Sequence, residues 1–141
     1  MTTTKTLTKV NTPVYTYVSQ SLPPSANESY KINYKQKRVY VSLKTRKFRA
    51  SIREHWKKTK LEKYVGDVTV MIRICPRTRR LRDLDNIHKP VLDAATRAHI
   101  WNDDSQVVNI ISHKCRCRSC DTFTFVVKPA HNIFKDPKLS L

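Results

Sequence analysis

Glycine is almost absent from this chain, since Gly66 is the only one among 141 residues. Phosphate-binding loops and dinucleotide-binding fingerprints need several glycines at fixed spacing, because the backbone must approach the phosphates closely. The sequence therefore excludes both kinds of nucleotide site. It also predicts that tight turns use Asn, Asp, Ser and Pro in place of glycine.

Acidic residues are scarce as well, and their scarcity makes the chain strongly basic. Only 11 Asp and Glu stand against 28 Lys and Arg, which gives a formal net charge of +17. A charge of this size favours a polyanionic partner, and nucleic acid is the first candidate. The alternatives are a solvated basic surface or a surface that binds an anionic membrane.

Long apolar runs are also missing. No stretch is long enough to cross a bilayer, and the Thr- and Lys-rich start of the chain lacks the apolar segment of a signal peptide. We therefore expect no membrane partner and a reducing compartment. There the 4 cysteines are expected to be thiols or metal ligands and not disulfides.

Apolar spacing predicts two helices. The first follows Ser42, a plausible N-cap, and places Phe48, Ile52 and Trp56 on one stripe. The second is expected over residues 86–99, with a proline in its first turn, where a missing N–H costs least. Trp101 and Phe48 are expected to pack in the core and not to stack on bases.

Strands are predicted where β-branched and aromatic residues alternate with polar ones. These segments are residues 14–18, 38–41, 68–75, 107–111 and 122–127, whereas residues 27–37 are predicted to form a loop. The expected fold is α+β, with the order strand, helix, strand, helix and strand pair, and with two helices packed on a single small mixed sheet. The length favours one domain: a basic tail at residues 1–13, a folded domain at 14–128 and a C-terminal tail at 129–141.

The most informative segment carries two aspartates just before the second predicted helix. Asp83 and Asp85 are two residues apart, so in an extended segment both carboxylates face one side. Lys89 lies one helical turn beyond Asp85, on nearly the same face. A second acidic pair, Asp103 and Asp104, follows the helix.

Acids inside an arginine-rich surface repel the phosphates that the arginines attract, and a hard divalent cation resolves this conflict. Mg²⁺ takes carboxylate oxygens, keeps several waters and bridges to phosphate. A bound metal also lowers the pKa of a water and offsets the charge that develops in phosphodiester hydrolysis. The alternative is that Asp83 and Asp85 form salt bridges with arginines, or that one of them caps the second helix.

Basic side chains that could bind DNA phosphates occur in two segments. Planar guanidinium groups suit phosphate, because each offers several donors in a fixed fork. The candidates are Arg77, Arg79, Arg80 and Arg82 beside the aspartates, and Lys35, Lys37 and Arg38 in the predicted loop.

A cysteine cluster lies between the last two predicted strands. Together with His113, it offers four potential zinc ligands: His113, Cys115, Cys117 and Cys120. Their spacing is too compressed for paired Cys-x-x-Cys knuckles, so we expect free thiols and no zinc at Cys115, Cys117 and Cys120. A zinc-stabilised binding module is the alternative.

Two motifs carry a family resemblance. Residues 82–86 read Arg-Asp-Leu-Asp-Asn and are followed by Lys89 and Asp93, and residues 101–107 read Trp-Asn-Asp-Asp-Ser-Gln-Val. In combination these motifs resemble the RusA-like Holliday junction resolvases, and the resemblance covers about residues 14–128. The chain departs from that pattern at Ala98-His99, where the family often has a glycine, and at Pro90.

The resemblance implies a homodimer that binds branched four-way DNA junctions and makes paired nicks with Mg²⁺, with one or two metal ions left open. It implies that the catalytic residues are Asp83, Asp85, Asp104 and, assisting them, Lys89. The implied metal ligands are Asp83, Asp85 and Asp104, with Asp103 as a further candidate. The implied location is the cytoplasm of a bacterial or phage-infected cell.

Two questions stay open at this level. A non-catalytic, architectural nucleic-acid-binding protein explains the charge equally well, although it does not explain two aspartate pairs around one helix. A helix over residues 86–99 is about 20 Å long. The chain must therefore fold straight back along it to bring the pairs together, or the second pair must serve the partner's site.

Overall fold

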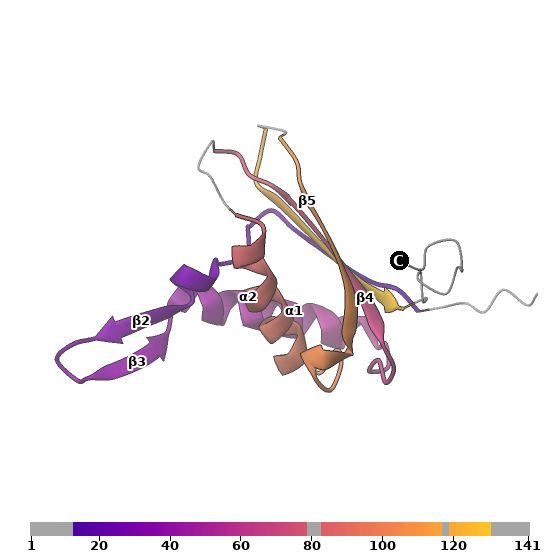
Figure 1. The fold of residues 1–141 in the computed structure, drawn as a ribbon, viewed down its shortest axis with the longest axis horizontal. Helices are drawn as coiled ribbons and strands as arrows, with labels where there is room; N and C mark the ends of the chain where they lie inside the picture. Colours follow the sequence, from indigo (N-terminus) through magenta and orange to yellow (C-terminus); the bar gives the residue numbers. More distant parts are fainter. Residues whose placement is uncertain (1–12, 79–82, 117–118, 131–141) are drawn as a thin grey trace, which may run out of the picture.

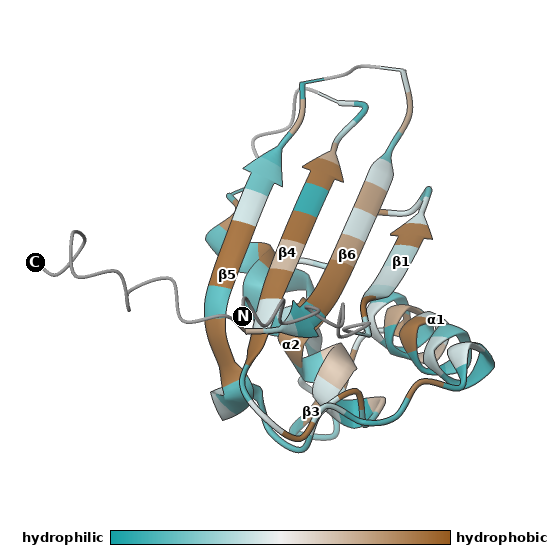
Figure 2. Ribbon diagram, turned by 90° about the vertical axis from the view of Figure 1, so that its right-hand side faces the viewer, coloured by the Kyte–Doolittle hydropathy of each residue, from teal (hydrophilic) through white to brown (hydrophobic). Residues whose placement is uncertain are grey.

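A mixed sheet of four strands forms the centre of the fold in the computed structural model, which describes residues 13–78, 83–116 and 119–130 (Figure 1). The strands are β1 (Tyr15–Ser19), β4 (Val68–Cys75), β5 (Val107–Lys114) and β6 (Thr122–Pro129). Their order across the sheet is β1-β6-β4-β5, which Figure 2 shows face-on, from β5 at the left to β1 at the right. β6 is antiparallel to both of its neighbours, whereas β4 and β5 are parallel.

Two helices cover one face of this sheet, α1 (Leu43–Thr59) and α2 (Asp85–Arg97) (Figure 1). Alternate residues of β4, from Val68 to Ile74, are buried against them. The α+β class and the two helices packed on a mixed sheet are therefore confirmed. The predicted final strand pair is wrong, because β5 and β6 do not pair with each other but flank β4 on opposite sides.

A separate hairpin of two strands, β2 (Tyr30–Asn33) and β3 (Arg38–Val41), extends away from the sheet (Figure 1). The prediction that residues 27–37 form only a loop is wrong, since they include β2 and part of the 3₁₀ turn η1 (Ala26–Glu28). The side chain of Asn33 accepts the backbone N–H groups of Lys35 and Gln36 and so closes the hairpin turn. Both faces of the hairpin are largely exposed.

Both predicted helices form, and their caps follow from local chemistry. Ser42 is the N-cap of α1, as predicted, and its hydroxyl accepts the N–H of Thr45 at 3.2 Å. α2 begins at Asp85, so Pro90 lies in the second turn and not in the first. There a residue with an N–H would have donated to the carbonyl of Asn86, and proline cannot.

Left-handed backbone occurs at three described residues, none of which is a glycine. Lys37, Lys60 and His99 have φ of 48°, 54° and 61°. The expectation that Asn, Asp, Ser and Pro replace glycine in such turns is wrong at these positions. Lys60 ends α1 and His99 follows α2, so both helices end in a conformation that usually selects glycine.

The core lies between the helices and the sheet. Trp101 is fully buried and Phe48 nearly so, which confirms that both pack in the core. Phe48, Ile52 and Trp56 form the buried stripe of α1, as predicted. Within the described ranges, neither helix has the length and apolar character that a transmembrane segment requires.

Candidate active site

The first aspartate pair lies at the amino end of α2, beyond the carboxyl end of β4. Asp83 and Asp85 are exposed, and Leu84 between them is half-buried and packs against the core. The predicted extended segment is wrong at Leu84, which has φ −61° and ψ −36°. Asp83 instead accepts the N–H of Asn86 through its backbone carbonyl, in a turn that leads into the helix.

The carboxylates of Asp83 and Asp85 form no hydrogen bond or ion pair with any other described residue. Leu84 is the N-cap of α2, and no side chain makes a capping hydrogen bond at this end of the helix. The alternative in which Asp83 or Asp85 caps the helix is therefore wrong. Asp85 lies in the first turn, where the helix dipole favours a negative charge. Both side chains are therefore placed where their oxygens can accept other ligands.

Lys89 lies one turn beyond Asp85, as the spacing predicts. Its ammonium is 3.5 Å from Oδ1 of Asp93, a pairing four residues along the same helix. The Lys89 side chain is 69% exposed, so this ion pair leaves it accessible. An exposed pair of this kind contributes little to stability, which leaves the amine free to act on a bound anion.

The second aspartate pair lies in the 3₁₀ turn η2 (Asp104–Gln106), just before β5. Asp103 is the N-cap of this turn and accepts the N–H of Ser105 at 3.3 Å. These hydrogen bonds from Ser105 hold the pKa of the Asp103 carboxyl below its ordinary value. One carboxylate is thus used to shape the turn, while Asp104 is exposed beside it.

Gln106 holds this turn against the rest of the molecule. Its Oε1 accepts the N–H groups of Asn102 and Asp103, at 2.8 and 3.2 Å. Its Nε2 donates to the carbonyls of Tyr64 and Gly66, at 3.0 and 2.9 Å. Gln106 is part of the motif at residues 101–107, but the sequence interpretation gave it no structural role, although an Asp followed three residues later by Gln is a recognisable capping pattern.

The two aspartate pairs lie at opposite ends of the sheet. In the parallel pairing of β4 and β5, Val68 lies beside Val107 and Ile74 beside Lys114. Asp83 and Asp85 follow the last residues of β4, whereas Asp103 and Asp104 precede the first residues of β5 (Figure 1). Between the pairs runs α2, whose 13 residues span about 20 Å.

The chain therefore does not fold back to bring its own aspartate pairs together. Among the described residues, no group of three or more Asp, Glu, His or Cys side chains is close enough to hold a metal ion.

A hydrogen bond between α2 and β5 was also not predicted from the sequence. The ring of His88 on α2 is hydrogen-bonded to the hydroxyl of Ser112 on β5. This bond ties the first turns of α2 to the edge strand.

The predicted DNA-binding residues are only partly within the described ranges. Arg77 is exposed, and its backbone N–H donates to Asp121 at 2.7 Å. Lys35, Lys37 and Arg38 are exposed at the turn of the β2–β3 hairpin. The other three candidates, Arg79, Arg80 and Arg82, lie outside the described residues.

Three thiols gather at one end of the sheet. Cys75, Cys115 and Cys120 form no disulfide with any described residue, and they line a cavity of about 210 Å³ together with Arg73. Arg73 donates to the Cys115 sulfur at 3.6 Å, and burial raises the pKa of the Cys75 thiol. Cys75 was not included in the predicted cluster, and Cys117 lies outside the described residues. The expectation that no zinc is bound here stays a prediction.

The chain is similar to known proteins over most of its length. A family model described as "Endodeoxyribonuclease RusA" matches residues 21–122, which include both aspartate pairs. The chain belongs to the RusA family. The resemblance inferred from the two motifs is therefore confirmed.

The curated relatives to which this chain is similar are named as crossover junction endodeoxyribonucleases. The protein of Escherichia coli (strain K12) is 36% identical over 88 residues, which are 62% of this chain and 72% of the relative. The protein of Enterobacteria phage 82 is 33% identical over 94 residues, which are 66% of this chain and 77% of the relative. The similarity thus includes relatives from a bacterium and from a phage.

Proposed function

We propose that this protein is a crossover junction endodeoxyribonuclease that resolves Holliday junctions and other branched DNA by paired phosphodiester hydrolysis. Membership of the RusA family and the names of the relatives support the activity. The observation that carries the proposal is the placement of two exposed aspartate pairs at the two ends of α2. A net charge of +17 supplies the attraction for DNA.

Mg²⁺ is the proposed cofactor, because the donor set fits it. Asp83 and Asp85 offer exposed carboxylate oxygens that no described residue occupies, and oxygen ligands are what this ion prefers. When bound, Mg²⁺ would offset phosphate charge and make a coordinated water more acidic. Lys89, on the next turn, is assigned to stabilise the charge on the phosphate oxygens during the reaction.

A homodimer is proposed because one chain separates the residues that the family motif combines. Each active site would contain Asp83, Asp85 and Lys89 of one chain and Asp104 of the second copy. Asp103 is assigned to position Asp104 through the capped turn, which uses one of its own carboxylate oxygens. Twofold symmetry then supplies two equivalent sites, as two opposed cuts in a four-way junction require.

The activity itself is tested by nicking of a synthetic four-way junction with and without Mg²⁺. We expect paired cuts in opposed strands that depend on the divalent ion. A folded protein that binds the junction but never nicks it would instead be a non-catalytic DNA-binding module.

Subunit mixing tests the shared site. Asp85→Asn and Asp104→Asn are each expected to abolish nicking alone, but a refolded mixture contains heterodimers with one intact site. Random pairing would restore about a quarter of the wild-type sites, because half of the dimers are mixed and each has one intact site of two. The matched control is a mixture of Asp83→Asn and Asp85→Asn, which restores no intact site in either arrangement. If the Asp85→Asn and Asp104→Asn proteins form mixed dimers that do not nick the junction, the shared-site arrangement is wrong.

A further inference from the structure

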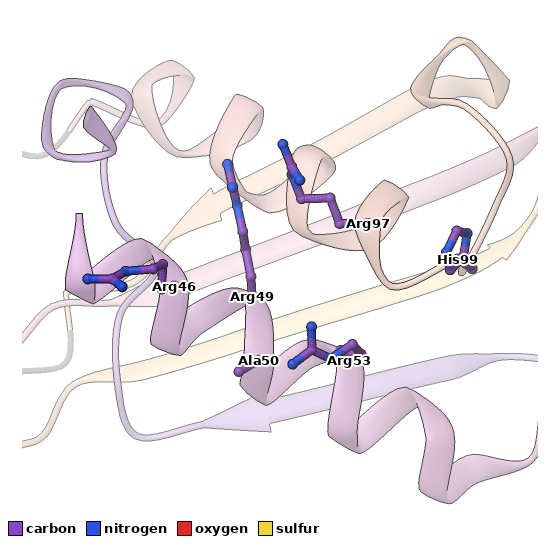
Figure 3. Close-up of a pocket in the computed structure, with 6 residues that line it drawn as sticks. All are labelled: Arg46, Arg49, Ala50, Arg53, Arg97 and His99. Carbon is purple, nitrogen blue, oxygen red and sulfur yellow. The ribbon is translucent and has the colours of Figure 1, made fainter. Parts of the chain in front are cut away.

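A hollow lined by basic side chains lies between the two helices, at the opposite end of α2 from Asp85 (Figure 3). Its volume is about 560 Å³, and Ala50 lines it together with the basic side chains. Three of its arginines come from α1, one is the last residue of α2, and a histidine follows that helix: Arg46, Arg49, Arg53, Arg97 and His99. We call these five residues the arginine pocket.

Among the residues that the structure describes, no acidic side chain lines the arginine pocket. The ion pairs among the described residues are Lys44 with Glu28 and Lys89 with Asp93, and none involves an arginine of the pocket. Several like charges in one hollow repel one another, and this repulsion opposes folding unless an anion compensates it. The pocket therefore has the electrostatics of an anion site and not of an internal salt-bridge network.

Arg49 adds an independent observation. Its Nε is buried and has no hydrogen-bond partner within the described part of the chain, although buried polar atoms in folded proteins are nearly always paired. Figure 3 shows Arg49 extending from α1 toward α2, with Arg97 ending in the same hollow. An acceptor that enters the pocket could accept a hydrogen bond from this Nε, for which the described residues offer no acceptor.

His99 supports the same interpretation from the backbone. Its φ of 61° is left-handed, where a side chain other than that of glycine or asparagine is strained. Strain of this kind is often kept where a side chain has a function. The imidazole is exposed and lines the pocket, where it can donate to an anion beside the guanidinium groups.

We infer that the arginine pocket binds a backbone phosphate of a DNA arm. This inference rests on the proposed function for its ligand, since guanidinium forks match phosphate oxygens and the proposed substrate is a phosphodiester polymer. α2 spans about 20 Å, so the phosphate held here is not the one that Asp83 and Asp85 of the same chain face. The pocket thus acts as a second point of contact that fixes the direction of the arm.

Binding in the absence of metal tests the pocket separately from cleavage. Arg49→Gln with Arg97→Gln removes two charges from the pocket, and Lys57→Gln with Lys58→Gln removes two exposed charges from the last turn of α1 outside it. The pocket variant should weaken junction binding by about tenfold or more and lower the log–log salt slope by about 0.9, which is one phosphate contact. The control should change affinity much less. Equal losses in both variants would overturn the inference.

Two further measurements exclude a merely structural role. Phosphate ethylation interference on the junction should show a position, distinct from the scissile phosphates, whose modification weakens wild-type binding but not binding by the pocket variant. His99→Gly should raise the melting temperature, because it relieves left-handed strain, and should nevertheless weaken junction binding. A stabilised His99→Gly protein with unchanged affinity, or an unchanged interference pattern, would count against the pocket.

Failure of this inference can be told apart from failure of the proposed function. If the wild-type protein nicks junctions while the pocket variant keeps full affinity, only the pocket assignment is wrong. If the wild-type protein never nicks but the pocket variant still loses affinity selectively, the pocket stands and the enzymatic proposal is wrong.

Discussion

Asp103 and Gln106 cap each other across the turn that presents Asp104. The Asp103 N–H donates to Gln106 Oε1 at 3.2 Å, and the Asp103 carboxylate accepts the N–H of Ser105 at 3.3 Å. Gln106 also reaches the carbonyls of Tyr64 and Gly66, in the segment between α1 and β4. The position of Asp104 therefore depends on Gln106, a side chain that is not among the proposed metal ligands.

Replacing Gln106 with Glu tests this dependence. The change keeps an acceptor for the turn but removes the amide donor, and it leaves two carbonyls facing a carboxylate. We expect the free energy of unfolding to fall by about 1–3 kcal/mol, and nicking of the folded fraction to fall as well, because Asp104 is displaced. Urea denaturation and single-turnover nicking on one preparation measure both. Gln20→Glu, at an exposed position just after β1, is the control and should change neither.

Much of the fold was predictable because local signals and burial agree. Ser42 begins α1 and the stripe of Phe48, Ile52 and Trp56 is buried, as the spacing indicated. β4, with its apolar alternation, has the predicted bounds. The hairpin strand β2 was missed because it is only four residues long and largely exposed, so no burial pattern marks it.

The candidate site was only partly predictable. Motif spacing identified both aspartate pairs, but their separation follows from the parallel pairing of β4 with β5, which no local pattern reveals. The arginine pocket could not be predicted from the sequence for a related reason. Arg49 and Arg97 are far apart in the sequence, and only the packing of α1 against α2 brings them to one hollow.

The aspartates are expected to act in catalysis and not in folding. Asp85→Asn and Asp104→Asn keep the side-chain size but remove the charge that would hold Mg²⁺, so each should abolish nicking while junction binding and melting temperature persist. Affinity without metal should stay level or rise, because a charge that repels phosphate is lost. Gel-shift titration and thermal melting are compared with nicking rates. If one of these variants nicks at a near wild-type rate, the aspartate that it replaces is not part of the active site.

Lys89 is expected to matter for rate and little for stability. Its pairing with Asp93 at 3.5 Å is exposed, and such pairs contribute about 0–1 kcal/mol. Lys89→Ala should therefore lose most of the nicking rate, keep its requirement for Mg²⁺ and melt close to wild type. Lys44→Ala removes the comparable pair with Glu28, at 3.1 Å, and should leave the rate unchanged. Equal rates in the two variants would contradict a catalytic role for Lys89.

The β2–β3 hairpin is expected to bind DNA phosphates through its turn. Lys35, Lys37 and Arg38 are exposed there, so replacing all three with Ala should leave the melting temperature unchanged and weaken junction binding. Each lost phosphate contact should lower the log–log salt slope by about 0.9. Fluorescence anisotropy over a range of salt concentrations measures the slope. An unchanged slope would show that the hairpin turn does not touch the junction.

Alkaline pH is expected to destabilise the protein through Tyr15. Its side chain is fully buried, and its hydroxyl is hydrogen-bonded to Nδ1 of His55 at 3.0 Å. Burial, with a smaller contribution from Tyr17, raises the pKa of Tyr15 well above the ordinary 10.0, and burial raises the pKa of Tyr64 in the same direction. The unfolded chain therefore releases these protons at lower pH than the folded protein does.

The stabilising effect of the neutral hydroxyl should be complete below pH 10 and should be lost as pH rises above that value. Urea midpoints measured from pH 8 to pH 11 should fall at the alkaline end. Tyr15→Phe should be less stable at neutral pH, because the bond to His55 is lost, but its midpoint should fall less steeply, with Tyr64 left to titrate. Tyr34→Phe is the control, since that side chain is 83% exposed and its loss should leave the profile unchanged. If the midpoint of Tyr15→Phe falls as steeply with pH as that of the wild type, a group other than Tyr15 causes the alkaline loss of stability.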